Sequence, residues 1–127
     1  MSLATMTIAD SSLAAEMWIS LRSLLASHVA MYSIAQPGDG WAIRATTANT
    51  MTIQNRRGTL RWTAPDASGA GTWHISATNP GGYTAHGRYE FTGEGLLRFY
   101  DEEEESLELE AAVERRLHPL QGTESRA

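Results

Sequence analysis

The chain has 127 residues, of which 42% are hydrophobic and 20% are charged, and its formal net charge is −5. These values are typical of a single globular domain and exclude an intrinsically disordered chain. The sequence contains no cysteine, which excludes disulfide bonds, thiolate metal sites and cysteine nucleophiles. All ten basic residues are arginine, so lysine Schiff-base and P-loop chemistry are excluded as well.

A long helix is predicted from Asp10 to about Ile34, and the turn-forming segment Pro37 to Gly40 ends it. One apolar stripe at spacings of three and four consists of Leu13, Met17, Leu21, Leu24, His28, Met31 and Ala35. A second stripe beside it consists of Trp18, Leu25, Val29 and Tyr32. Together the stripes are wider than one sheet contact requires. We therefore expect a homodimer in which Trp18, Leu25 and Val29 form the contact.

His28 lies within the first of these stripes. We interpret it as a partly buried, hydrogen-bonded core histidine. A metal-ligand role would need partner side chains that the stripe itself does not supply.

From Trp41 to Tyr100 the apolar residues recur at every second position, which predicts short β-strands. The alternating runs are 41–46, 51–54, 59–63, 72–77, 83–91 and 96–100. Turn-forming residues separate most of these runs, so we expect a six-stranded antiparallel β-meander with one apolar and one polar face. The long helix should cover the apolar face. Odd-numbered strand residues are expected to be buried, and Trp62, Trp73 and Ile75 to belong to the main core.

A shorter second helix is predicted from Asp101 to about Leu117, with Asp101 as its N-cap. The predicted fold class is therefore α+β, with one domain over residues 6–118. We interpret residues 1–5 as an expression leader and residues 119–127 as a flexible tail. No run approaches the roughly 18 apolar residues of a membrane helix, and the N-terminus lacks the basic region of a signal peptide. We therefore expect a cytoplasmic protein without a membrane partner.

Glutamate residues dominate the start of the second predicted helix. They are Glu102 to Glu105, followed by Glu108, Glu110 and Glu114. This run could form a divalent-cation site or an acidic docking patch. We favour a structural role, because successive helical residues point about 100° apart and acids stabilise the positive end of a helix. We accordingly expect no metal and no cofactor.

Two histidines lie on neighbouring predicted strands. If the loop from Thr78 to Gly82 pairs Ala77 with Tyr83, His74 lies directly opposite His86 on the polar face. A register shifted by two residues would place His74 opposite Arg88 instead. A cross-strand histidine pair can bind a transition metal, but a third ligand is missing, since Glu90 lies about 13 Å along the strand. Two solvated histidines are the simpler interpretation.

Positive charge is concentrated on the predicted polar face. Its charged members are Arg44, Arg61, Arg88 and Arg98, with His74 and His86, and Glu90 is the only acid assigned to it. Such a face could accept an anionic ligand or an acidic protein partner. Alternatively, threonine and arginine simply suit an exposed sheet, and the acidic second helix folds back over it. Which of the two holds depends on where that helix packs.

Two functions are consistent with these features. The first is a non-enzymatic binding protein whose ligand contacts Arg61, His74, His86 and Arg88. The second is a small hydrolase-like enzyme with His74 or His86 as general base. No catalytic sequence motif supports the enzyme. Nucleic acid is not an expected partner, because the strand aromatics should be buried and so cannot stack on bases.

Overall fold

The computed structural model describes residues 11–78, 82–100 and 106–121. The elements are α1 (Ser11–Ala35), η2 (Pro37–Asp39), β1 (Ala42–Thr47), β2 (Thr50–Asn55), β3 (Gly58–Thr63), β4 (Ala70–Ala77), β5 (Tyr83–Phe91), β6 (Leu97–Phe99), β7 (Ser106–Leu107), α2 (Leu109–Leu117) and η3 (His118–Leu120). The protein is therefore α+β, as the sequence pattern predicts. Neither α-helix combines the length and the hydropathy needed to span a membrane.

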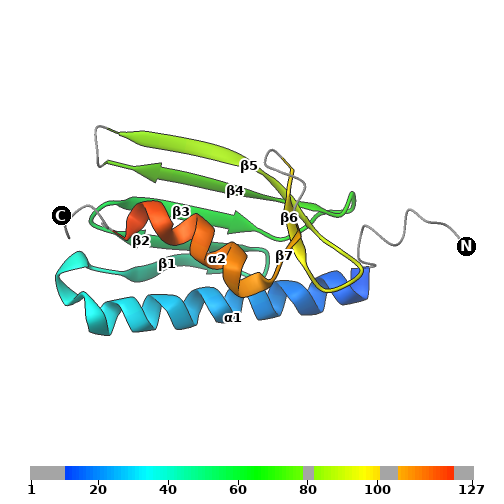
Figure 1. Cartoon of the computed structure of the whole chain (residues 1–127), viewed down its shortest axis with the longest axis horizontal. Coiled ribbons are helices and arrows are strands. Elements are labelled where there is room, and N and C mark those ends of the chain that lie inside the picture. Colours follow the sequence, from blue (N-terminus) through cyan, green and yellow to red (C-terminus); the bar gives the residue numbers. More distant parts are fainter. Residues whose placement is uncertain (1–10, 79–81, 101–105, 122–127) are drawn as a thin grey trace, which may run out of the picture.

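The strands form one antiparallel sheet in the order β1-β2-β3-β4-β5-β6-β7 (Figure 1). The prediction of six strands was one short, because Ser106 and Leu107 belong to a strand and not to the second helix. Leu107 is buried and pairs with Leu97 of β6, so pairing with the sheet edge overrides the helical pattern there. The predicted cap at Asp101 lies outside the described residues.

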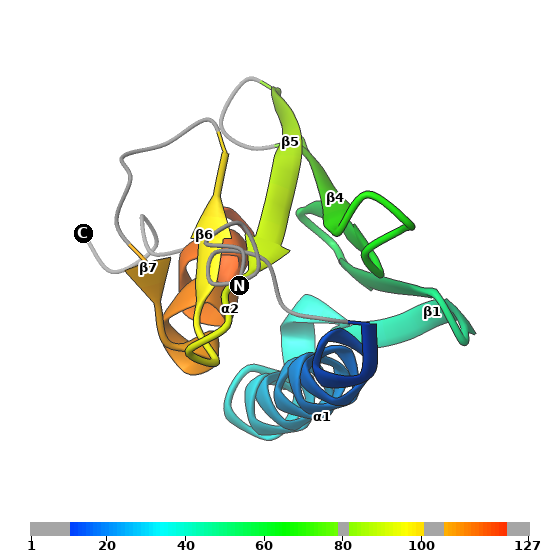
Figure 2. The ribbon, with the colours of Figure 1, turned by 90° about the vertical axis from the view of Figure 1, so that its right-hand side faces the viewer.

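Both α-helices lie on the concave side of the curved sheet (Figures 1 and 2). The inner face of α2 joins the core through Val113 and Leu117. From the same helix, the Arg116 guanidinium stacks 4.1 Å from the Trp73 ring centroid and 4.4 Å from that of Phe99. The second helix thus packs on the apolar face beside α1 and does not fold over the polar face.

Most residues of both apolar stripes of α1 are at least partly buried, because the helix contacts β1 on one side and α2 on the other. Trp18, Leu25 and Val29 are buried within the chain. The expectation that these residues form a dimer contact is therefore wrong. The exposed large apolar residues of α1 are Ile19, Met31 and Ile34.

The odd–even burial rule holds in β2 and β4 but fails in β3, where Leu60 and Trp62 are buried and Arg61 is exposed. The reason is the tight turn between β2 and β3, which pairs Asn55 with Gly58 and so exchanges the faces of odd and even residues. The rule also fails at the first residue of β5, since Tyr83 is 45% exposed.

In β1 the register shifts between Ile43 and Ala45, so Ala45 pairs with Thr52 while Ile43 pairs with the buried Ile53. A β-bulge of this kind exchanges the faces of the residues that follow it. Ile43 itself is 40% exposed, because β1 is the edge strand.

Leu120 lies in the segment that was predicted to be a flexible tail, but it packs in the core. Leu120 of η3 is buried, and its carbonyl accepts a 2.8 Å hydrogen bond from the Asn55 side-chain amide. The same Asn55 side chain accepts hydrogen bonds from the backbone amides of Arg57 and Gly58 at 2.7 and 3.2 Å. Asn55 thereby joins the β2–β3 turn to the C-terminal segment. Residues 1–5 and 122–127 lie outside the described part of the chain.

Candidate functional site

The two strand histidines face each other across β4 and β5. His74 pairs directly with His86, and Ala77 pairs with Tyr83, which is the predicted register. The imidazole rings are stacked, with centroids 6.3 Å apart and planes inclined by 21°. Both side chains are exposed on the convex, polar face of the sheet.

Arg61 extends this pair into a row, because it lies directly opposite His74 on β3. The structure therefore brings three predicted site residues onto consecutive strands in register. Arg88 lies one step away, opposite Thr72, and its guanidinium stacks 4.6 Å from the Tyr100 ring centroid. It borders the row diagonally and does not belong to it.

The other two arginines of this face have partners of their own. Arg98 forms a 2.7 Å ion pair with Glu90, and Arg44 donates a 3.2 Å hydrogen bond to the Gln54 side chain. Glu90 was expected on the exposed polar face, but it is only 3% exposed. The Tyr100 hydroxyl also donates to it at 3.2 Å. Burial, followed by the negative charge of Glu90, raises the pKa of Tyr100.

Arg61 and Arg88 differ from Arg98 in their ion pairing. Within the described part of the chain, neither Arg61 nor Arg88 forms an ion pair. Both side chains are exposed. A cationic side chain without an acidic partner can offer its full hydrogen-bonding fork to a carboxylate or phosphate group.

A hollow lies elsewhere in the described structure, at the N-terminal end of α1. It has a volume of about 500 Å³ and lies between Trp18 and Ile19 of α1, the β1–β2 turn, and the loop from Pro65 to Gly69. A second hollow of about 340 Å³ lies between α1 and β1. Neither hollow is lined by any of the four predicted site residues.

One cluster of potential metal ligands was missed by the sequence analysis. His28 of α1 lies beside Glu110 and Glu114 of α2, and the donor atoms of the three side chains lie within 4.8 Å of one another. The partners that His28 was expected to lack come from the second helix. The sequence held one signal, since Glu110 and Glu114 are four residues apart and so share a helix face.

No protein-family model matches this chain, and neither the curated proteins nor the solved structures that were searched gave a significant match. The function must therefore be inferred from the geometry of the chain itself.

Proposed function

We propose that this chain is a non-enzymatic binding protein that takes a carboxylate- or phosphate-bearing ligand on its convex sheet face. The observation that carries the proposal is the in-register row of Arg61, His74 and His86, which is exposed and has no acidic ion-pair partner among the described residues. Three neighbouring strands span about 10 Å, which suits a small ligand with one or two anionic groups.

The roles within the site follow from side-chain chemistry. Arg61 supplies a planar fork for two oxygen atoms of the anion. His74 and His86 supply ring N–H donors. Arg88, held against the Tyr100 ring, supplies positive charge at the border of the row.

The alternative was that the acidic second helix covers the polar face of the sheet. The packing of α2 supports the binding proposal instead, because that helix lies on the opposite face. The hydrolase-like alternative has His74 or His86 as general base. A deep pocket around a histidine would favour it, whereas both rings lie on an open face and line neither of the two hollows. An open face suits binding better than it suits water-excluding chemistry.

The test is isothermal titration with inorganic phosphate, citrate and a nucleoside triphosphate. Arg61→Gln combined with Arg88→Gln should weaken binding by at least about tenfold, because charge-assisted hydrogen bonds are lost. The matched control is Arg22→Gln with Arg115→Gln, which removes the same charge from the two helices and should bind like wild type.

Two outcomes would contradict the proposal. One is equal affinity of the wild type and the Arg61→Gln/Arg88→Gln variant. The other is failure of all three probes to bind the wild-type chain.

A further inference from the structure

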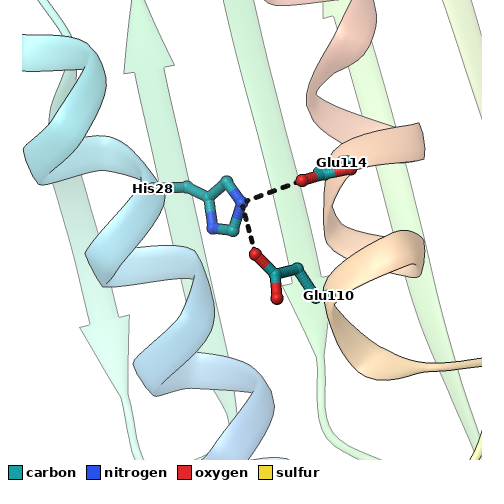
Figure 3. A group of neighbouring side chains, drawn as sticks. All are labelled: His28, Glu110 and Glu114. Atoms are coloured by element: carbon teal, nitrogen blue, oxygen red, sulfur yellow. Dashed lines mark ion pairs between the residues drawn. The ribbon is translucent and has the colours of Figure 1, made fainter.

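His28 is a buried histidine whose two ring nitrogens face different surroundings. The residue is 3% exposed, and its Nδ1 lies 2.9 Å from the Leu24 carbonyl oxygen. A carbonyl oxygen can only accept a hydrogen bond, so Nδ1 is the protonated donor. This bond fixes the ring orientation and directs Nε2 out of α1 toward α2 (Figure 3). The same arrangement orients histidines that ligate metals, whose second ring nitrogen donates to a carbonyl or carboxylate.

Nε2 points between two carboxylates. Its distances to the nearest oxygens of Glu114 and Glu110 are 3.7 and 4.0 Å (Figure 3). Both exceed the roughly 2.7–3.2 Å of a direct hydrogen bond. Donor atoms that share one tetrahedral ion with bonds of about 2.1 Å lie about 3.4 Å apart. The three donor atoms here lie within 4.8 Å of one another, so they must move slightly closer together to share an ion.

The two glutamates are free to close this small gap. Their side chains are 64% and 58% exposed, whereas the His28 side chain is fixed and only 4% exposed. Glu110 and Glu114 are one helical turn apart, so both can reach a point above Nε2. Their exposure leaves further coordination positions open to water.

The surroundings of the cluster are partly polar. The Tyr32 ring lies 5.9 Å from that of His28, and its hydroxyl accepts a 2.8 Å hydrogen bond from Gln121.

We propose that His28, Glu110 and Glu114 bind one divalent transition-metal ion of the zinc type, which joins α1 to α2. The imidazole ligand favours such an ion over Mg²⁺ or Ca²⁺, which prefer all-oxygen sites. This proposal differs from the sequence-based expectation of a chain without a metal. The inference is independent of the anion-binding face, because the site lies on the other side of the sheet.

The experiment is isothermal titration of the metal-free chain with Zn²⁺, followed by Mg²⁺ as a comparison. Wild type should bind one Zn²⁺ per chain, at least about tenfold more tightly than Mg²⁺. Glu110→Gln combined with Glu114→Gln should weaken Zn²⁺ binding by more than about tenfold. Because both glutamates are exposed, the variant should fold normally, and circular dichroism checks this.

Two control variants separate this site from adventitious binding. Glu16→Gln with Glu94→Gln removes two carboxylates outside the cluster, and His74→Asn with His86→Asn removes the strand histidine pair. Both should keep the wild-type affinity and stoichiometry for Zn²⁺. Zn²⁺ should also raise the melting temperature of the wild type but not that of the Glu110→Gln/Glu114→Gln variant.

The proposal would be overturned by a wild type that binds no stoichiometric Zn²⁺, or by equal affinity in the Glu110→Gln/Glu114→Gln variant. Loss of binding in His74→Asn/His86→Asn alone would place the metal on the strand pair and would also overturn it. In each of these cases His28 serves only as an ion-pair partner between the helices.

Discussion

Tyr89 illustrates how single residues hold this small core together. Its ring is fully buried between Trp62 and Phe91, with centroids 5.3 Å from each, and its hydroxyl donates a 2.8 Å hydrogen bond to the Thr63 carbonyl. Gly71 makes room for it, because a Cβ atom at that position would lie 2.5 Å from the ring. Large aromatic groups are thus accommodated by the absence of a side chain on the paired strand.

Tyr89→Phe should change how stability depends on alkaline pH. Burial raises the pKa of Tyr89 above its ordinary value. An unfolded tyrosine loses its proton near pH 10, whereas the folded one keeps it, so stability falls as pH rises above about 10. The phenylalanine variant should show a shallower fall and lose about 1 kcal/mol at neutral pH.

Urea unfolding at neutral pH and at several values between about pH 9 and 11 measures both effects. Part of the alkaline fall should remain, because the pKa values of Tyr32 and Tyr100 are also raised. Identical slopes in the wild type and in Tyr89→Phe would show that Tyr89 does not govern the alkaline response.

At the scale of elements, α1 acts as a core helix of the monomer. Its apolar surface, which is wider than a sheet alone would need, is explained by contact with both β1 and α2. A second copy of the chain is not required to cover Trp18, Leu25 and Val29. The width of an apolar stripe therefore predicts how much of the helix surface is covered. It does not predict whether another element of the same chain or a second chain covers it.

Leu25→Ala should lower the free energy of unfolding by about 2–5 kcal/mol, because it leaves a cavity in the core. Light scattering should give the same molar mass for the variant as for wild type. Ile34→Ala is the control, since Ile34 is 83% exposed and its loss should cost less than about 0.5 kcal/mol. A variant of wild-type stability with half the wild-type mass would restore the dimer interpretation.

At the scale of the whole molecule, charges of opposite sign lie on opposite faces of the sheet. The exposed glutamates of α2 lie on the concave side, and Arg61 and Arg88 lie on the convex side. A chain with net charge −5 can therefore present a local positive potential to an anion.

Phosphate binding to the convex face should weaken as salt is added. Salt screens exposed charges over about 10 Å at 0.1 M and about 3 Å at 1 M. Isothermal titrations across this range of salt concentration check the trend. Affinity that does not change with salt would contradict a solvated cationic site.

The sequence by itself determined the local structure. Apolar residues spaced by three and four predicted α1, and apolar residues at every second position predicted β1 to β6. The length of the loop between β4 and β5 predicted the pairing of His74 with His86. These features depend on residues that are neighbours in the chain, where periodicity and turn geometry act directly. One step of the candidate anion-binding row, from His74 to His86, could be predicted for the same reason, whereas the pairing of Arg61 with His74 came from the structure.

Only the tertiary structure decided which distant surfaces meet. It placed α2 beside α1, docked Leu120 in the core, and brought Glu110 and Glu114 to His28. Each contact joins elements far apart in the sequence or depends on how the sheet curves. Which surfaces come into contact depends on how two whole apolar faces fit together, and no local sequence pattern contains that information.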